Sequence, residues 1–483
     1  MTELPRLEKI DRWRWRVPLD KPSGMHVEGR IYSSADLIDS VRNDPSLQQV
    51  ANVATLPGIV GASLAMPDIH WGYGFPIGGV AAFDIDEGII SPGGVGYDIN
   101  CGINLTRTRL TLEEIQPHLE TLANMLFTGV PCGVGIGGDI RLGVKGIRDV
   151  AAKGARWAVK QGYADVLDLE NMEEGGCLDS ADPGAVSDEA CERGADQIGT
   201  LGSGNHFLEV QVVDEVFDPD AAQTLGLALG HVCVMVHSGS RGFGYQVCQE
   251  QLKKMGRAPA KYGIPLVDRQ LACAPVNSPE GRTYASAMAA AANMAWTNRI
   301  VLVGRVRRIF EAVFGEPWRS LGMNLVFDVS HNIAKFETHT VGGHERRLVV
   351  HRKGATRSFG PGDPRIPSSY RTIGQPVLIP GDMVTGSYVL VGTKKAMEET
   401  FGSTCHGAGR LLSRSAALRA TKGRDLFREM RERGVIVRSR SKRTLGEEVP
   451  EAYKNIDAVV EAAEGAGIAR RVVRLKPLAV IKG

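Results

Sequence analysis

The chain has 483 residues, with 57 Lys plus Arg, 55 Asp plus Glu and a formal net charge of +2. This balance argues against a histone-like polycation and leaves room for a local basic groove. Eight cysteines without regular spacing or a CxxC pair exclude a disulfide framework, so reduced thiols are expected.

Short β-like runs alternate with helical patterns along the chain. The runs are residues 79–83, 103–106, 232–236, 325–328 and 377–379. The longest helical pattern extends from about residue 279 to residue 314. This mixture predicts an α/β or α+β fold with substantial sheets. Asp98 precedes one run, and His237 and His331 end two others, which is where open α/β sheets usually place ligand groups.

Residues 142–196 differ in composition from the rest of the chain. A Lys/Arg-bearing helical pattern is followed there by an acidic stretch and a Gly/Asp/Pro-rich region. We interpret this range as a helical insertion with an exposed loop. Because no internal repeat and no long Ser- or Pro-rich linker occurs, we expect residues 1–483 to form a single integrated domain, with two domains as the alternative.

Two segments bear on cellular location. Residues 1–16 are charged and lack an apolar core, so no secretory signal is expected. The apolar stretch 285–296 is interrupted by Ser286 and Asn293 and falls short of the roughly 20 residues of a bilayer span. We therefore expect a soluble cytoplasmic protein without a membrane partner.

Glycine is over-represented: it makes up 58 of the 483 residues, whereas its usual share is about 7 %. The glycines cluster beside histidines and acidic residues. His406 lies in one such motif, STCHGAGR (403–410), ahead of an Arg- and Leu-rich helical pattern. The small neighbours leave the imidazole open to a bulky partner, and a helix start nearby suits phosphate oxygens. His406 is therefore a candidate nucleophile, with a buried structural histidine as the alternative.

Five residues of metal-ligating types occur in separate motifs: Asp98, Cys101, His206, His237 and His331. No two of these histidines are paired at close spacing, which excludes a zinc finger or an HExxH protease. A metal site would have to be assembled from distant segments, and the spacing alone leaves this open. Ligand softness by itself favours zinc or iron over manganese.

Several motifs, taken together and in this order, resemble the RtcB-type RNA ligases. They are MPDIH (66–70), GYGFPIGG (72–79), GYDINCG (96–102), GSGNHFLE (202–209), VHSGSRG (236–242), DVSHN (328–332) and STCHGAGR (403–410). The resemblance runs from about residue 27 to residue 483. It implies one large RtcB-like catalytic domain, with central β-sheets surrounded by helices.

The resemblance implies that the five ligand types hold two adjacent Mn²⁺ ions. Cys101 would bridge both ions, Asp98 and His206 would complete one site, and His237 and His331 the other. A thiolate between two cations is deprotonated outright, and paired metals offset charge at a reacting phosphorus. Inhibitory zinc binding stays open.

For the nucleotide, the resemblance implies that His406 carries GMP, taken from GTP, as a phosphoramidate. Glu209 would accept hydrogen bonds from the guanine edge, Tyr453 would stack or hydrogen-bond at the base, and Lys482 would reach the guanine. Asp382 stands where many family members have serine, and its effect on nucleotide selectivity is open. The full set of nucleotide positions is Asn205, Phe207, Glu209, Asp382, Ser387, His406, Gly407, Ala408, Gly409, Tyr453 and Lys482.

For RNA, the matching positions are Arg193, Arg241, Asn332, Lys353 and Arg410. Arginine suits bidentate phosphate contact, and a structural salt bridge is the alternative for each. Asp68 matches an acidic position needed for activity, with orienting or deprotonating an RNA hydroxyl as one role. His70 is either close to it or a core histidine. The basic residues of 419–443 are a further candidate RNA surface, with a solvated helix face as the alternative.

The resemblance implies a GTP- and Mn²⁺-dependent RNA ligase that joins 3′-phosphate or 2′,3′-cyclic phosphate ends to 5′-hydroxyl ends, through histidine–GMP and RNA(3′)pp(5′)G intermediates. The expected partners are tRNA halves or broken RNA ends, GTP and the helper protein archease, whose need is open, and a monomer is expected. The chain lacks the Lys-x-Asp-Gly signature of conventional polynucleotide ligases and a Walker A motif. The alternatives are a dimetal cyclic phosphodiesterase, which would not need His406, and a non-catalytic RNA-binding protein.

Overall fold

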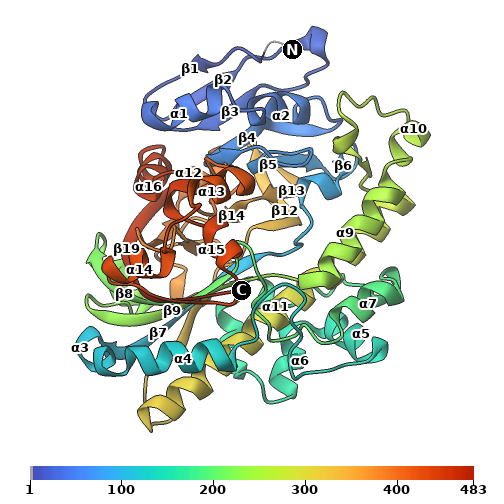
Figure 1. The fold of residues 1–483 in the computed structure, drawn as a ribbon. Coiled ribbons are helices and arrows are strands. Elements are labelled where there is room, and N and C mark those ends of the chain that lie inside the picture. Colours follow the sequence, from blue (N-terminus) through green and yellow to red (C-terminus); the bar gives the residue numbers. More distant parts are fainter. Residues whose placement is uncertain (1–3) are drawn as a thin grey trace.

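Two large sheets and one long helix organise the molecule (Figure 1). The structure, a computed structural model, describes residues 4–483. Residues 1–3, which open the N-terminal segment in which no secretory signal is expected, lie outside this range. The α/β class with substantial sheets, predicted from the alternating runs, is confirmed.

The first sheet carries the N-terminal part of the chain. Its seven strands follow the order β1 (Glu8–Lys9), β2 (Arg14–Val17), β3 (Gly29–Tyr32), β4 (Ile59–His70), β5 (Ile77–Asp84), β13 (His344–Lys353) and β12 (Asn332–Val341). Neighbouring strands are antiparallel except β3 and β4. The helices α1 (Ala35–Arg42) and α2 (Ser46–Val53) bury Ile38 and Leu47 against Ile31 of this sheet.

The second sheet supplies the edge at which most candidate ligands lie. Seven of its eight strands follow the order β11 (Asn324–Ser330), β7 (Gly102–Thr111), β9 (His231–Ser238), β8 (Phe207–Val216), β19 (Ala469–Lys482), β16 (Ser387–Gly392) and β15 (Pro376–Ile379), and β18 (Ile436–Ser439) pairs with β19. The register aligns Gly102 with Ser238 and Ser330, and Phe207 with Lys482. Ends of five strands therefore meet at one edge of this sheet.

Two short strand pairs lie outside the large sheets. They are β6 (Ile89–Ile90) with β10 (Ala274–Pro275), and β14 (Ala355–Arg357) with β17 (Ser403–Cys405). The second pair matters for function, because His406 directly follows β17.

The long helix α11 (Pro279–Phe314) has the bounds that the sequence predicts. Ser278 caps its start by accepting a hydrogen bond from the Gly281 amide, and Gly315 ends it in the left-handed region at φ 71°. The middle of α11 is buried against β9, β7 and neighbouring helices. This apolar stretch nevertheless contains the buried polar residues Asn298 and Arg299, whose hydrogen bonds must be satisfied inside the protein.

The range 142–196 contains α5 (Val144–Lys153), α6 (Ala155–Lys160) and α7 (Asp188–Gly194). These helices lie below α9 (Arg241–Met255) and beside α11 in Figure 1. Ile147, Val150 and Ala158 share one apolar cluster with Ala287 and Ala291 of α11. The helical content agrees with the sequence pattern, whereas the status of this range as an insertion in a single domain stays a prediction.

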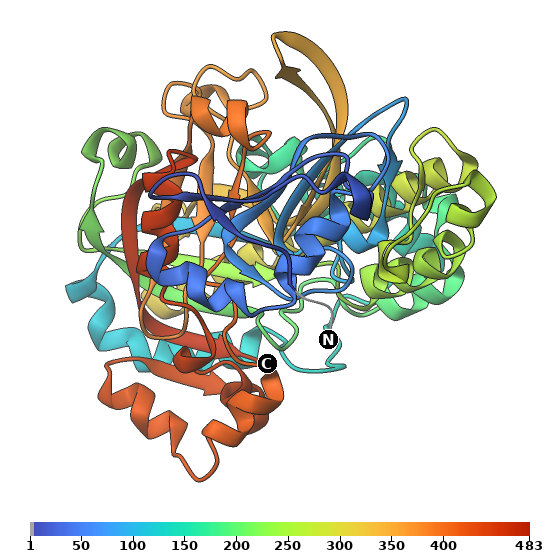
Figure 2. The same cartoon turned by 90° about the horizontal axis from the view of Figure 1, so that it is seen from above.

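The helices between residues 414 and 447 form a group at one side of the molecule, at the lower left of Figure 2. Arg424 pairs there with Glu429, and Arg431 and Arg438 both pair with Glu120, so part of the predicted basic surface is neutralised.

No helix within residues 4–483 has the length and apolarity to cross a membrane. The helices not yet given are α3 (Leu112–Ile115), α4 (Leu119–Gly129), α8 (Pro219–Leu225), α10 (Ala258–Tyr262), α12 (Lys394–Glu399), α13 (Arg414–Ala420), α14 (Leu426–Glu432), α15 (Lys442–Glu447) and α16 (Ile456–Gly465).

Candidate active site and metal centre

The five candidate metal ligands come together at the edge of the second sheet. Asp98 and Cys101 lie in the loop that leads into β7, and His206 directly precedes β8. His237 is the penultimate residue of β9, and His331 connects β11 to β12. Four segments far apart in the sequence thus supply one cluster, in keeping with the strand-end positions in the sequence.

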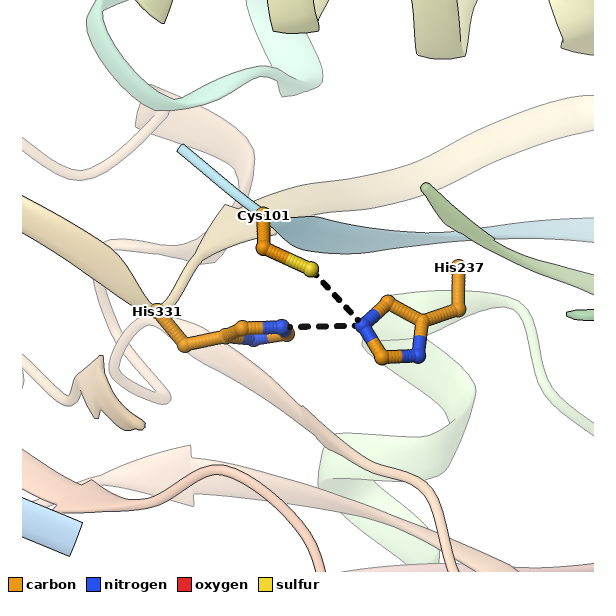
Figure 3. A group of neighbouring side chains, drawn as sticks. All are labelled: Cys101, His237 and His331. Carbon is orange, nitrogen blue, oxygen red and sulfur yellow. Dashed lines mark hydrogen bonds between the residues drawn. The ribbon is translucent and has the colours of Figure 1, made fainter. Parts of the chain in front are cut away.

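The thiol of Cys101 is at the centre of this cluster. Its Sγ lies 3.4 Å from Nε2 of His206 and 3.1 Å from Nε2 of His237. Figure 3 shows the second contact and the 3.1 Å separation between Nε2 of His237 and Nε2 of His331. Nε2 of His206 is also 2.9 Å from the carboxylate of Asp98. Two groups of three donors result, and Cys101 belongs to both.

The donor set fits a pair of metal ions. Within each group the ligand atoms lie within 4.8 Å of one another. The carbonyl of Leu201 is 3.0 Å from Nδ1 of His206, so Nδ1 carries the proton and Nε2 is free to coordinate, as in most metal-binding histidines. Three imidazole nitrogens, a thiol and a carboxylate that converge in this way match divalent cations of the first transition row.

Burial sets the protonation states of the cluster. It lowers the pKa values of His237 and His331 well below the usual range, and neighbouring imidazoles lower them further, so both rings are neutral ligands. Burial and the charge of Asp98 raise the pKa of the Cys101 thiol, which therefore needs a cation to become a thiolate. For Asp98, burial opposes ionisation, but the adjacent His206 ring and the positive charge of Arg241 prevail, and the pKa falls to about 2.

Asp68 holds His406 next to the metal cluster. Nδ1 of His406 is 2.6 Å from the Asp68 carboxylate, and the backbone amides of His406 and Gly407 donate to the same oxygen at 3.0 and 3.3 Å. Because Nδ1 donates to a carboxylate, Nε2 carries the free lone pair. The ring lies 5.1 Å from that of His331. His406 is thus a nucleophile candidate with a fixed tautomer.

Two details of this region differ from the sequence-based expectation. Asp68, for which an RNA hydroxyl is one suggested partner, is fully buried on β4 and contacts His406. The helix expected just after His406 begins only at Arg414, with Ser413 as its cap. The intervening residues instead pack tightly on β4, since a Cβ at Gly409 would overlap the backbone carbonyl of Asp68.

One cavity of about 340 Å³ joins the metal cluster to the predicted nucleotide site. Predicted site residues that do not line it are Asp68, Asp98, Arg193, His206, Arg241 and Ser387. Those that line it are Cys101, Asn205, Phe207, Glu209, His237, His331, Asn332, Lys353, Asp382, His406, Gly407, Ala408, Gly409, Arg410, Tyr453 and Lys482.

The nucleotide end of the cavity is buried and contains ionisable side chains. Glu209 and Lys482 lie on the adjacent strands β8 and β19, and both side chains are buried. Burial raises the pKa of Glu209 to about 8 and lowers the pKa of Lys482. Arg410 donates to Glu448 and to the hydroxyl of Tyr453, each at 3.2 Å, so its guanidinium is tied to the protein.

Asp382 and Ser387 are occupied by local contacts. The carboxylate of Asp382 accepts hydrogen bonds from the amides of Val384 and Thr385 at 2.8 and 2.9 Å, so it stabilises its own turn while bordering the cavity. The hydroxyl of Ser387 accepts from the Gln211 amide at 3.1 Å, and the same Gln211 nitrogen donates to Glu209 at 2.7 Å. Ser387 therefore acts on the cavity through its neighbours.

Three of the predicted RNA contacts, Arg241, Asn332 and Lys353, each have a different partner in the protein. Arg241 begins α9 at φ 56°, with Nε 3.3 Å from the Thr200 hydroxyl. Asn332 donates to the carbonyl of Asp98 at 3.2 Å and so supports the metal loop, whereas the Lys353 ammonium donates to the Phe75 carbonyl at 3.0 Å. Burial lowers the pKa of Lys353 to about 7.

Two further predicted residues, Arg193 and His70, differ in their surroundings. Arg193 is exposed on α7 and pairs with Glu189 at 3.5 Å. His70 borders the cavity, and its Nδ1 is 2.9 Å from the carbonyl of Asp68.

The sequence analysis missed Asn298 and Arg299 on α11. Arg299 donates to the carboxylate of Asp328 and to the carbonyls of Asn100 and Ser238 at 2.7 and 3.1 Å. Asn298 donates to the carbonyls of Thr200 and Gly239, both at 3.1 Å. These acceptors belong to the segments that carry the ligands. The available signal was polar residues in the middle of an Ala- and Val-rich helix.

Comparison with known proteins gives consistent matches over the whole chain. A family model described as tRNA-splicing ligase RtcB matches residues 49–483. A protein of this name from Thermococcus kodakarensis is 54 % identical over 484 residues, covering 100 % of both chains. One from Archaeoglobus fulgidus is 53 % identical over 477 residues, covering 99 % of each. The RNA-splicing ligase RtcB of Mycobacterium tuberculosis is 53 % identical over 438 residues, which cover 90 % of this chain and 100 % of the relative.

Proposed function

Because this chain belongs to the RtcB family of tRNA-splicing ligases and is an RNA ligase, we propose that it joins an RNA 3′-phosphate to a 5′-hydroxyl with GTP as the activating nucleotide. A 2′,3′-cyclic phosphate would first be hydrolysed to the 3′-phosphate. The observation that carries this proposal is His406, whose Nδ1 donates to Asp68 at 2.6 Å and whose Nε2 is free beside the metal cluster.

In the first step, Nε2 of His406 attacks the α-phosphorus of GTP, an N–P bond forms and pyrophosphate leaves. The attack places positive charge on the imidazole. Asp68, with its buried carboxylate on Nδ1–H, stabilises this charge and keeps the ring in one tautomer, the role that a carboxylate plays beside a catalytic histidine.

In the second step, an oxygen of the RNA 3′-phosphate attacks the same phosphorus and the N–P bond breaks, which gives RNA(3′)pp(5′)G and returns His406 to its neutral form. In the third step, the 5′-hydroxyl attacks the phosphorus of the former 3′-phosphate and GMP leaves. Arg241 and Lys353 lie near the cluster, where cationic groups offset the charge of the reacting phosphates.

Two Mn²⁺ ions are part of this proposal, held by Asp98, Cys101, His206, His237 and His331. Ions bound there would act as Lewis acids on the phosphate oxygens. The shared position of Cys101 in both groups of donors supports a bridging thiolate. Manganese follows from the resemblance of the motifs, whereas the softness of the thiolate also suits zinc, so zinc would compete for the site.

Glu209, Tyr453 and Lys482 are proposed to recognise the guanine base. Glu209 is buried at the nucleotide end of the cavity, where its ionised carboxylate would accept hydrogen bonds from guanine N–H groups. The remaining proposed nucleotide contacts are Asn205, Phe207, Asp382, Ser387 and the Gly407–Ala408–Gly409 segment, with Asn332 and Arg410 supporting the reacting ends.

The physiological substrates are proposed to be tRNA halves or broken RNA ends, because the relatives carry names of tRNA-splicing and RNA-splicing ligases. We further propose a monomer that forms one RtcB-like domain, with 142–196 as a helical insertion, and archease as a helper protein. The eight cysteines are all buried and unpaired, which supports a reducing, cytoplasmic setting.

A covalent adduct tests the proposed function. The protein is incubated with Mn²⁺ and GTP labelled at the α-phosphate, and the labelled residue is identified by mass spectrometry. We expect GMP on His406 in the native protein and none in His406→Ala. A dimetal phosphodiesterase would open cyclic phosphates without any adduct, so a label on lysine or no label at all contradicts the proposal.

A further inference from the structure

Three tyrosines from separate segments form an aromatic cluster at the active-site cavity, here called the tyrosine platform: Tyr73, Tyr97 and Tyr245. The rings of Tyr97 and Tyr245 are stacked, with centroids 5.1 Å apart and planes at 26°. The ring of Tyr73 meets Tyr97 edge-on at 6.0 Å. Tyr73 is 36 % exposed and Tyr245 is 46 % exposed, so the platform offers ring surface to solvent.

The platform is continuous with the reacting groups. Tyr73 and Tyr97 line the same cavity as Cys101, His331 and His406, and Tyr97 directly precedes the candidate ligand Asp98. The Lys353 side chain, which also lines the cavity, donates to the backbone carbonyl of Tyr73.

Helix α9 supplies the third ring on a face that turns toward the cavity. Tyr245 follows Arg241 by four residues, and Cys248 and Leu252 continue the same helical face. Cys248 and Leu252 both line the cavity, so this face of α9 forms one of its walls. The exposed ring of Tyr245 therefore stands at the rim of the cavity.

The platform is separate from the residues proposed to bind guanine. Those residues lie on β8 and β19 and in the segments around Asp382 and Tyr453. The platform instead comes from the β4–β5 connection, the loop before β7 and helix α9. The residues assigned to the nucleotide and the aromatic rings therefore come from different segments of the cavity wall.

The stacked rings leave part of their surface exposed beside the cavity. A contiguous exposed apolar surface generally marks a binding site, and the three hydroxyls make no hydrogen bond to any residue within 4–483. Flat aromatic ligands stack on such rings. An RNA ligase must hold RNA ends whose sequence varies, and stacking on aromatic side chains holds any base, because every base has a π-face.

We propose that the tyrosine platform stacks a nucleobase of single-stranded RNA next to the ends that are joined. This inference rests on the proposed function, in which His406 and the metal cluster act on RNA phosphates. The platform then fixes the RNA end in the cavity without reading its sequence, while the charged groups near the cluster position its phosphate.

The test measures RNA affinity for matched variants. Short single-stranded RNA with a 3′-phosphate, and a second RNA with a 5′-hydroxyl, carry a fluorophore at the far end and are titrated with the full chain in Mn²⁺ buffer. Tyr97→Ala and Tyr245→Ala remove a ring, whereas Tyr97→Phe and Tyr245→Phe keep it. Phe336→Ala is the control, because Phe336 is 48 % exposed on β12 and does not line the cavity.

We expect each alanine variant to weaken binding of at least one of the two RNAs by about 5- to 150-fold, the range that corresponds to about 1–3 kcal/mol for one stacked base. The phenylalanine variants and Phe336→Ala should bind like the native protein. RNA that is abasic at the terminal position should bind the native protein more weakly by a similar factor. The Tyr97→Ala variant should bind this abasic RNA no more weakly than the native protein does.

Several results separate the possible failures. Transfer of GMP to His406 in the alanine variants shows that they are folded and that the guanine site is intact. The inference is overturned if the alanine variants bind both RNAs normally, if the abasic and alanine effects simply add, or if the alanine variants lose GMP transfer instead of RNA binding. If the native protein neither binds nor joins these RNAs, the proposed function itself fails.

Discussion

The contact between Asp68 and His406 allows a sharp prediction for two substitutions of one residue. A single oxygen of Asp68 accepts from Nδ1 of His406 and from the amides of His406 and Gly407. In Asp68→Asn, an amide nitrogen at this position would face three donors, so the side-chain oxygen must occupy it. The two backbone amides therefore fix the orientation of the asparagine, and Nδ1 of His406 keeps its proton.

The Asp68→Asn variant should then lose only the negative charge. A hydrogen bond to a charged group contributes about 1.5–3 kcal/mol and a neutral one about 0.5–1.5 kcal/mol, a difference of about 1–2 kcal/mol. This corresponds to a rate of GMP transfer about 5- to 30-fold slower. The loss of about 10⁴-fold known for the equivalent change in a serine protease comes from a wrong tautomer, which the backbone amides prevent here.

The Asp68→Ala variant removes the acceptor for all three donors. Each buried donor left without a partner costs about 1–3 kcal/mol, so the loop that carries His406 loses its fixed position. We expect GMP transfer to fall by more than about 10³-fold. If Asp68→Asn slowed GMP transfer as much as Asp68→Ala does, the argument that the backbone fixes the tautomer of His406 would be refuted.

The assay is the single-turnover rate of adduct formation at saturating GTP and Mn²⁺, so that binding does not limit the signal. Circular dichroism and thermal unfolding of both variants control for loss of fold. A native rate in Asp68→Asn would show that the carboxylate charge has no part in activating His406.

Three other predictions address the metal centre, the guanine contact and the origin of the junction phosphate. Cys101→Ala removes the ligand common to both groups of donors. It should abolish Mn²⁺ binding in calorimetry together with GMP transfer, while thermal unfolding still shows a folded protein. Wild-type GMP transfer by this variant at limiting Mn²⁺ would contradict the two-metal proposal. Burial raises the pKa of Glu209 to about 8, and guanine N–H groups prefer the ionised carboxylate. The affinity of the His406→Ala variant for GMP should therefore rise by up to about tenfold per pH unit between pH 6 and 8. With Glu209→Gln added, the affinity for GMP should not change with pH in this range. RNA with a labelled 3′-phosphate should keep its label inside the joined product, and fragments with a 5′-phosphate and a 3′-hydroxyl should not be sealed.

The regular elements were readable from the sequence where the local pattern is strong. The apolar runs at 232–236 and 325–328 lie within β9 and β11, and the 36-residue helix α11 has the bounds its composition predicts. Apolar runs of this kind indicate buried elements, and their length distinguishes a short strand from a long helix.

The contacts that define the site were beyond sequence patterns, because they join segments far apart in the chain. Asp68 and His406 are 338 positions apart, and neither motif indicates that it contacts the other. The turn that occupies Asp382 and the late start of α13 depend on local hydrogen bonds. The single-domain organisation and the site roles stay predictions, which the experiments above address.

The buried charge on α11 connects the sequence pattern to the chemistry. A buried Arg–Asp pair adds little net stability, since the desolvation of both charges offsets their attraction, and apolar side chains would fill the middle of α11 equally well. Arg299 instead holds the carbonyls next to Cys101 and His237, and binds Asp328 on the strand that leads to His331.

Asn298 completes this arrangement by holding the Thr200 carbonyl in the segment before His206. One helix therefore contacts all four segments that carry the ligands. A functional site must be held to within about 0.5 Å by supporting residues on rigid elements, and α11 is the element that meets this requirement for Cys101, His206, His237 and His331 together. Asn298 and Arg299 in this apolar helix are explained by the position of the ligands, because packing alone gives no reason for them.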